Sequence, residues 1–425
     1  MMKKILYTLL TLLAATSCNK MLELYPHSAI SPESVTENDV PQLRVGLYWE
    51  VQELPQRASY ILEDLLGGNL TAKNSTSTIA LINSILNAQS EIIEEAWQGA
   101  YMALYQVNNV YGIAEGLPEG AVRDRILGEA CYFRAYIYLQ LVTRWGDVPL
   151  LTRNTVNDVP REKAEKVWEQ ILKDLDTAIS LLGDNTDYYY VSRDAATALK
   201  ARALLFLGRS SEAAVLADGL IANARYKLDS FDNIYRGTTN TETFFAFKCA
   251  TADGSKISIS TLFYSYNHPN KGSYVYMPAP DVMTLFEDGD TRKEMTVTTL
   301  DGLNFINKYP SGQTGTDPFI VSRLAEMYLI SAEAGGLDRG LGRLNELRNA
   351  RGLESIYPMT EKAFQDAVLL ERRREFVGEN LRFTDLVRTG RAVEELGIQP
   401  YQQLLPIPES ELQNNSLLQP QNPNY

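Results

Sequence analysis

Paired amphipathic helices are the feature that most constrains the fold of this 425-residue chain. Between residues 91 and 114, apolar residues recur every three or four positions, as they do on one face of a helix. These residues are Ile92, Ala96, Trp97, Ala100, Leu104, Val107 and Val110. A second stripe runs from about 122 to 143 and ends before Gly146 and Pro149, residue types that stop helices. The pattern repeats over 167–182 and 195–207, so we predict successive antiparallel helical hairpins.

One connection between these helices has the character of a tetratricopeptide-repeat turn. Its sequence is Leu207-Gly208-Arg209-Ser210-Ser211-Glu212-Ala213. A weaker helical pair is predicted over 322–334 and 340–350. Because one hairpin cannot bury its inner face alone, about four hairpins should stack into a curved solenoid. The predicted fold class is therefore mainly α, with tetratricopeptide-like hairpins packed on a loop-rich C-terminal region that has a few short β-strands.

A long segment interrupts the helical pattern. Over 227–317 the chain fills with Tyr, Thr, Gly, Asn and Pro, and short β-like runs occur at 243–247 and 274–277. We therefore expect one domain over 40–425, with helical repeats at 40–226 and 318–352, an insertion at 227–317, and a C-terminal helix and tail at 361–425. Long insertions in a repeat scaffold usually carry the binding surface, so ligand contact is expected first in 227–317.

The N-terminus has the pattern of a lipoprotein signal peptide. Lys3 and Lys4 precede the apolar run 5–13, and small residues at 14–17 precede Cys18. The apolar run is shorter than the roughly 20 residues that span a bilayer. We predict a signal peptide over 1–17, lipid attachment at Cys18, and a tether over 18–39 leading into the fold. An ordinary secretory signal followed by a coincidental cysteine is the alternative.

Charge and cysteine content narrow the partners. The formal net charge is −13, and loss of Lys3 and Lys4 would leave about −15, which argues against nucleic acid and anionic lipid headgroups as partners. Cys131 and Cys249 do not form a C-x-x-C motif, so a structural zinc site is not expected. Export would permit one disulfide between them, but Cys131 lies in a strongly helical pattern and is better explained as a small buried hydrophobe.

The sequence shows no recognisable catalytic or cofactor motif. It has two histidines, His27 in the tether and His268 in a loop, and it lacks G-x-S-x-G, H-E-x-x-H and phosphate-binding glycine loops. Asp288 and Asp290 could bind Ca²⁺, but the EF-hand pattern is missing and a solvated acidic turn is expected instead. No metal, no cofactor and no enzymatic activity are therefore predicted, although glycosidase carboxylate pairs cannot be identified from sequence.

Aromatic and amide side chains suggest a ligand surface. Flat rings can stack on sugar faces or cover a peptide, while neighbouring amides supply hydrogen bonds. The candidate ligand-binding residues are Tyr264, Tyr266, Tyr274 and Tyr276 in the insertion, with Asn69 and Asn74 in the loop 67–90. The alternative is that the alternating tyrosines face the covered side of a strand.

The charged tract Glu371-Arg372-Arg373-Arg374-Glu375-Phe376 has a different interpretation. Glu371 and Glu375 are four residues apart, so they lie on one helix face around the arginines. Apolar residues flank the tract on both sides. We predict buried or half-buried ion pairs that hold the C-terminal helix to the repeats, in preference to a nucleic-acid patch.

Taken together, these features resemble the SusD-like (SusD/RagB) nutrient-binding outer-membrane lipoproteins of Gram-negative bacteria. The resemblance runs nearly end to end and includes the lipobox Cys18. The N-terminal motifs that carry it are Asp39-Val40, Gly46-Leu47-Tyr48, residues 129–136, Trp145-Gly146-Asp147-Val148-Pro149-Leu150 and residues 195–208. The C-terminal motifs are Leu344-Asn345-Glu346-Leu347-Arg348, Arg351-Gly352-Leu353, residues 371–376, Asp385-Leu386-Val387-Arg388, Leu404-Leu405-Pro406-Ile407-Pro408 and Gln421-Asn422-Pro423-Asn424-Tyr425.

The resemblance implies a function as well as a fold. Members of this family act as lids on a SusC-like, TonB-dependent outer-membrane transporter, to which they deliver an oligosaccharide or a peptide. By resemblance, the repeat face should dock the transporter, the segments 67–90 and 261–277 should face the ligand, and the lipid should hold the protein on the outer membrane, facing the exterior. Two other classes stay open: a surface glycoside hydrolase, and a repeat scaffold that binds only proteins.

Overall fold

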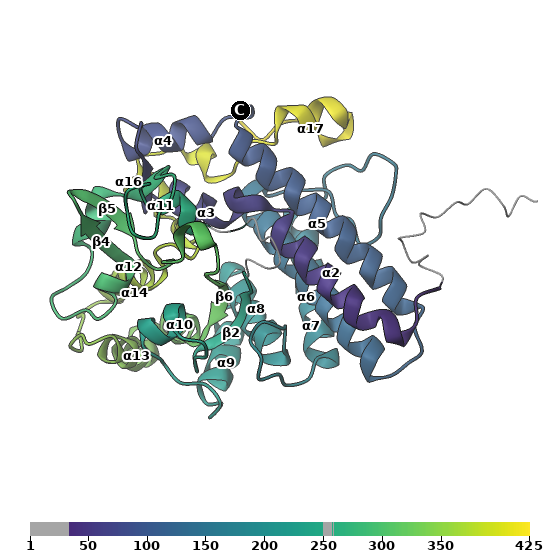
Figure 1. The fold of residues 1–425 in the computed structure, drawn as a ribbon, viewed down its shortest axis with the longest axis horizontal. Coiled ribbons are helices and arrows are strands. Elements are labelled where there is room, and N and C mark those ends of the chain that lie inside the picture. Colours follow the sequence, from purple (N-terminus) through teal and green to yellow (C-terminus); the bar gives the residue numbers. More distant parts are fainter. Residues whose placement is uncertain (1–33, 250–256, 258) are drawn as a thin grey trace, which may run out of the picture.

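Helices dominate the computed structural model, which describes residues 34–249, 257 and 259–425 (Figure 1). The predicted signal peptide, Cys18 and most of the predicted tether lie outside the described residues. Within the described part of the chain, no helix has the length and apolar character needed to cross a membrane.

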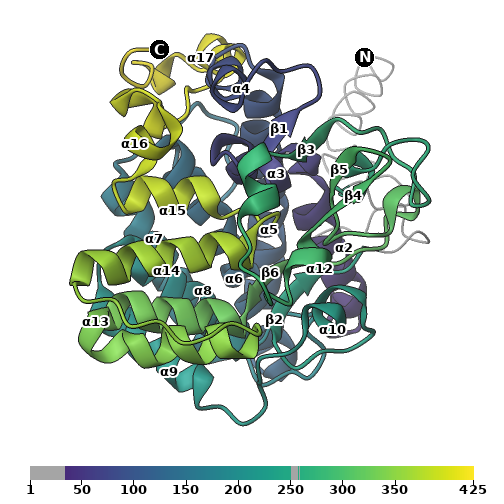
Figure 2. The same cartoon turned by 90° about the vertical axis from the view of Figure 1, so that its left-hand side faces the viewer.

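Eight helical segments form four consecutive hairpins. The first two hairpins are α5 (Glu91–Glu115) with α6 (Ala121–Trp145), and α7 (Ala164–Leu181) with α8 (Arg193–Phe206). The third pairs α9 (Ser210–Ile221) with the first half of α13 (Leu324–Ala350), and the fourth pairs the second half of α13 with α14 (Glu361–Phe376). Each segment packs against the next, and Figure 2 shows α9, α13, α14 and α15 in successive layers. The predicted fold class is confirmed.

Two glycines create turns that this stack requires. Gly208, at φ +69°, follows α8 and allows α9 to begin at Ser210, within the predicted tetratricopeptide-like turn. Gly336, at φ +63° and ψ −175°, breaks α13 into two parts that fold back on each other. The return is so close that a Cβ on Gly340 would stand 1.9 Å from the Ala332 carbonyl oxygen. This reversal is the predicted pair at 322–334 and 340–350.

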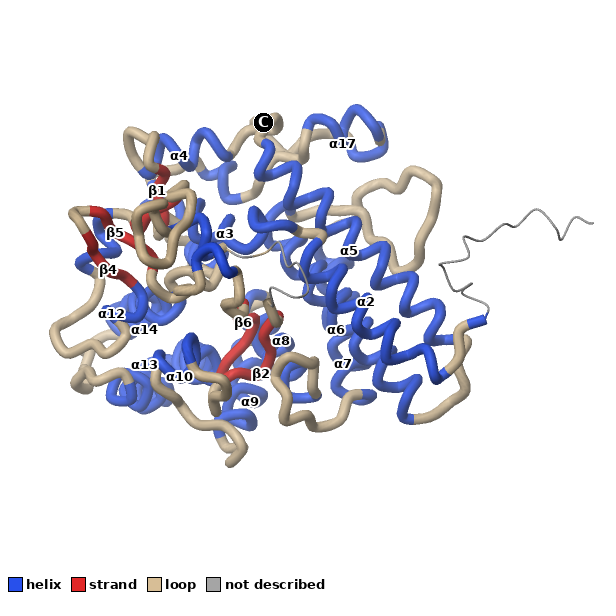
Figure 3. Tube along the Cα trace, viewed as in Figure 1, coloured by secondary structure: helices blue, strands red, loops and turns tan. Residues whose placement is uncertain are grey.

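The long insertion leaves the scaffold between α9 and α13. It contains α10 (Phe231–Arg236), α11 (Ser260–Phe263), α12 (Lys293–Thr296) and short strands. Among the described residues the strands form three antiparallel ribbons: β1 (Leu70–Ala72) with β3 (Tyr276–Pro278), β2 (Thr243–Phe247) with β6 (Phe319–Arg323), and β4 (Val297–Leu300) with β5 (Leu303–Ile306). β2 and β6 are fully buried, whereas β1, β4 and β5 lie on the side of the molecule away from α5–α7 (Figure 3).

Both ends of the described chain pack on the scaffold. α2 (Val40–Glu53) and α3 (Gln56–Leu66) lie against α5, and α4 (Thr78–Ile85) follows β1. After α14 come α15 (Arg382–Arg388), α16 (Ala392–Leu396) and α17 (Glu409–Asn414). The tail is fixed at the end of α6, where the Trp145 Nε1 donates a hydrogen bond to the Pro406 carbonyl at 2.9 Å. The side chains of Cys131 and Cys249 are both buried, and Cys131 behaves as the predicted small hydrophobe.

Candidate ligand surface

The β1–β3 ribbon brings together the two segments that the sequence suggested for ligand contact. Ala72 lies opposite Tyr276 in the antiparallel register, and the Lys73 amide donates to the Val275 carbonyl at 3.4 Å just beyond it. The segment 67–90 therefore meets the end of the segment 261–277, although the paired residues are about 200 positions apart in the chain. We call the exposed and half-buried side chains of Arg57, Lys73, Asn74, Glu95, Tyr266 and Tyr276 the ribbon surface.

A closed loop presents the most exposed candidate ring. Backbone hydrogen bonds join Tyr274 to Tyr264 at 3.0 Å and Val275 to Leu262 at 2.8 Å, so the residues between them form a loop. Tyr266 lies in this loop with 73% of its surface exposed. Its ring is available for stacking, which is what the sequence prediction requires of a ligand contact.

Tyr276 occupies a half-buried position beside the start of α5. Burial raises the pKa of its hydroxyl, and the nearby negative charge of Glu95 raises it further. Burial and the charge of Glu91 likewise raise the pKa of the Glu95 carboxyl. Arg57 of α3 donates from Nη1 to the Thr261 hydroxyl at 3.0 Å, which ties the insertion to the N-terminal helices. The ribbon surface thus combines rings, an amide and charges of both signs.

Three of the six candidates are buried, and their predicted role as ligand contacts is corrected. Tyr264 is fully buried against Phe305 and donates its hydroxyl to Asn307 Oδ1 at 2.9 Å. The buried Tyr274 donates its hydroxyl to the Asn304 carbonyl at 3.2 Å. These tyrosines face the covered side of the insertion, as the alternative interpretation proposed.

Asn69 is buried for a different reason. Its Nδ2 donates to Asp64 Oδ1 at 2.7 Å, and its Oδ1 accepts a hydrogen bond from Arg373 Nε at 2.9 Å. All of its side-chain polar groups are therefore engaged inside the protein. Asn69 fixes the start of β1, whereas Asn74 is exposed on the ribbon surface.

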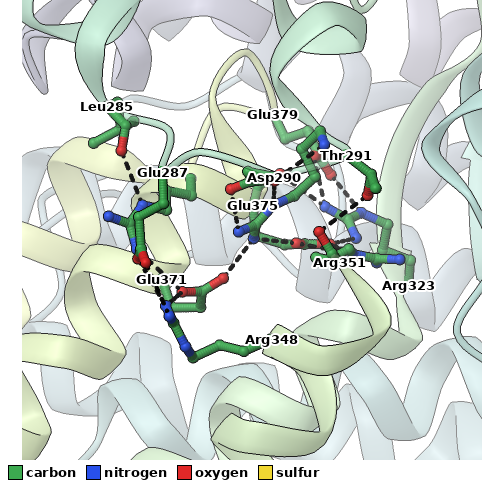
Figure 4. Close-up of polar contacts among 12 residues, drawn as sticks. Leu285, Glu287, Asp290, Thr291, Arg323, Arg348, Arg351, Glu371, Glu375 and Glu379 are labelled. Carbon is green, nitrogen blue, oxygen red and sulfur yellow. Dashed lines mark hydrogen bonds and ion pairs between the residues drawn. The ribbon is translucent and has the colours of Figure 1, made fainter. Parts of the chain in front are cut away.

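A buried ionic cluster holds the insertion on the scaffold (Figure 4). Glu375 of α14 lies 2.9 Å from Arg292 and 2.7 Å from Arg351, and it also pairs with Arg323. All four side chains are almost fully buried. Burial alone would raise the pKa of Glu375, but the charges of Arg351, Arg323 and Arg292 hold it well below its usual value. The predicted ion pairs of the tract 371–376 are present, and two of these arginines belong to the insertion and its return strand.

The same cluster overturns one expectation about the acidic turn. Asp290 is not solvated: it is buried and binds Arg292 through both carboxylate oxygens, at 2.8 Å to Nε and 2.7 Å to Nη2. The neighbouring guanidinium already compensates its charge. Across the described part of the chain, no group of three or more His, Cys, Asp or Glu side chains is arranged to hold a metal ion.

A second surface feature lies on α5 and escaped the sequence analysis. Trp97, Tyr101 and Tyr105 occupy successive turns, and with Met102 they form the floor of a groove of about 510 Å³. Leu54, Gln98, Gln106 and Glu411 complete its lining. The signal was present in the sequence, because Met102 and Tyr105 lie off the predicted apolar stripe of this helix. We call this feature the α5 groove.

Two family models match separate parts of the chain. A model described as "Starch-binding associating with outer membrane" matches residues 20–205, and the SusD family model matches residues 298–403. The chain belongs to the SusD/RagB family. A SusD-like protein, P38 of Formosa agariphila, is 26% identical over 92% of this chain and 91% of its own length.

Solved structures of SusD-like proteins share the fold. A laminarin-binding SusD-like protein has a TM-score of 0.78 at 24% identity, covering 92% of this chain and 100% of its own. Surface glycan-binding protein A from Bacteroides thetaiotaomicron, in complex with laminarihexaose, has the same TM-score at 20% identity and the same coverage of both chains. Both of these structural neighbours bind glycans.

Proposed function

We propose that this SusD-like chain is a lipid-anchored, cell-surface protein that captures an oligosaccharide and delivers it to a SusC-like TonB-dependent transporter. The observation that carries the proposal is the β1–β3 pairing, which assembles the ribbon surface from two distant segments. Stacking faces, an amide and charged hydrogen-bonding groups together suit a hydroxyl-rich ligand. Two SusD-like neighbours bind laminarin or laminarihexaose, which favours a glycan over a peptide as the ligand.

Membership of the SusD/RagB family supports the proposed membrane attachment and transporter docking. Lipidation at Cys18 would keep the domain at the outer membrane, facing outward, and the helical repeats would supply the docking face. A reciprocal purification tests the partner: the tagged chain, purified in detergent from the cells that naturally produce it, should retain a TonB-dependent transporter. Separate elution of the two proteins would contradict the docking role.

Ligand capture is tested by isothermal titration of the purified chain with a panel of oligosaccharides and peptides. The double variant Tyr266→Ala, Tyr276→Ala should bind the preferred ligand at least tenfold more weakly, because both rings would be lost. Tyr357→Ala is a matched control, since Tyr357 is 76% exposed but lies outside the ribbon surface. Unchanged affinity in the double variant would remove the ribbon surface as the binding site.

The same incubations test for enzymatic activity. A capture protein should return the oligosaccharide intact, so chromatography should detect no shorter product after prolonged incubation. Glu95 is the carboxylate of the ribbon surface, and the charge of Glu91 acts on it. Product formation that Glu95→Gln abolishes would replace the binding role with a glycoside hydrolase.

A further inference from the structure

The α5 groove has the chemistry of a saccharide site. Tyr101 and Tyr105 are four residues apart on α5, about 6 Å along the helix axis, and the buried Trp97 lies one turn before Tyr101. Tyr105 is 51% exposed and Met102 is 45% exposed, so the floor is open to solvent. A volume of about 510 Å³ lies within the range of small-molecule sites.

The groove floor is held in place from behind. Trp97 is buried and packs edge-on against Trp145 at 5.2 Å between ring centroids. Tyr101 packs against Trp97 at 5.1 Å and donates its hydroxyl to the Pro149 carbonyl at 3.0 Å. These internal contacts fix Trp97 and Tyr101 behind the exposed Tyr105 and Met102, so a ligand in the groove would have to order fewer side chains.

The rim of the groove selects for a neutral ligand. Its polar groups are Gln98, Gln106 and Glu411, and the lining contains no cationic side chain. Gln98 Nε2 donates to Glu411 Oε1 at 2.9 Å, which fixes both side chains at the edge of the floor. A sulfated or carboxylated chain would meet the Glu411 charge with no compensating cation. Pyranose rings without acidic groups match apolar faces with amide edges.

The groove and the ribbon surface meet on the same helix. Glu95, whose charge acts on Tyr276, lies seven residues before Met102 of the groove, so both side chains are on the same face of α5. Leu54, at the corner between α2 and α3, lines the groove, while Arg57 of α3 reaches the insertion. In Figure 1, α5 lies between α17 above and α2 below. Ten residues of α5 separate Glu95 from Tyr105, a rise of about 15 Å.

We infer that the α5 groove is a second saccharide subsite, which binds the neutral, distal part of a chain whose other end lies on the ribbon surface. This inference rests on the proposed glycan-binding function and extends it. The ribbon surface holds a short oligosaccharide, and the groove adds contacts only when the chain is long enough to pass the α2–α3 corner. Affinity should therefore increase with chain length.

Affinity electrophoresis and titration of the full-length mature domain test this length dependence. The probes are laminarin, starch, xylan and inulin, with their di- to octasaccharides, and pectin and alginate as acidic counterparts. For the neutral glycan that binds, the variant Met102→Ala, Tyr105→Ala should lose about tenfold in affinity for the polymer and octasaccharide. It should bind the shortest retained oligosaccharide like wild type. Val215→Ala, a 70% exposed side chain on α9, controls for loss of surface apolar area.

The outcomes separate the two proposals. Equal polymer affinity in the groove variant and wild type, with binding still lost in the Tyr266→Ala, Tyr276→Ala variant, overturns the groove and leaves the ribbon surface in place. If wild type binds only the acidic glycans, the neutral subsite in the groove is overturned, and the ribbon surface stays in place. Failure of wild type to bind any glycan overturns both proposals. Loss of transporter co-purification in the groove variant, with unchanged glycan affinity, would assign the groove to a protein partner instead.

Discussion

Neutralising Glu375 should destabilise the whole domain. The change Glu375→Gln keeps the size of the side chain but removes the one carboxylate that pairs with all three of Arg292, Arg323 and Arg351, which are nearly fully buried. Breaking a buried ion pair by removing one partner costs about 3–5 kcal/mol. With an unfolding entropy of about 2.1 cal/mol/K per residue and roughly 400 residues, this cost corresponds to a Tm lower by about 4–6 °C.

Differential scanning calorimetry of wild type, Glu375→Gln and Glu212→Gln measures the effect. Glu212 pairs with Arg209 at 2.6 Å on an exposed helix start, so its variant should melt with wild type. Because the pKa of Glu375 is held well below its unfolded value, its stabilisation is present above about pH 4 and is lost as the pH falls further. The difference in Tm between wild type and Glu375→Gln should therefore become smaller at acid pH. Equal Tm values at pH 7 would refute the reasoning that this charge holds the insertion on the scaffold.

Three further perturbations test other parts of the structure. Burial lowers the pKa of Lys308 to about 8, so the contribution of this residue to stability should rise as the pH goes from 8 towards 10. In urea titrations, the free energy of unfolding of wild type should therefore rise relative to that of Lys308→Met over this pH range. A difference between the two that does not change with pH would contradict the prediction. Gly336→Ala should lower the free energy of unfolding by about 1–3 kcal/mol in thermal melts, because Gly336 has a positive φ. Gly342→Ala should not destabilise the protein, because Gly342 is helical and has open space around it. Equal losses in the two variants would contradict the need for glycine at the turn. Cys18→Ser should move the protein from the membrane fraction to the soluble fraction, and normal surface labelling of this variant would refute lipid anchoring.

The helical scaffold could be predicted because its signals are local. Apolar spacing along α5 to α8 and the glycine turn at Gly208 depend on residues within a few turns of one another. Even the weak pair around Gly336 was predicted, although a single glycine makes the reversal there. Repeats of this kind reveal themselves in sequence because each hairpin packs mainly on its neighbours.

The candidate ligand surface was predicted only in part, because distant contacts decide which side chains stay exposed. Tyr264 and Tyr266 have similar sequence surroundings, yet Phe305 and Asn307 bury the first and leave the second in solvent. Asp290 is likewise buried because it pairs with Arg292, which also pairs with Glu375 of α14 in the interior. Sequence proximity identified the right segments, but the fold selects the residues within them.

The interruption of the third hairpin has a consequence for how the protein folds. α9 must wait for the first half of α13, which follows only after residues 222–323 have been made. Closing a loop of about 100 residues costs roughly 3 kcal/mol more than closing a four-residue turn. The first two hairpins can form from nearby sequence, but the last two depend on the collapse of the insertion. Changes in the insertion should therefore slow the completion of the repeat stack, even where they touch no repeat helix.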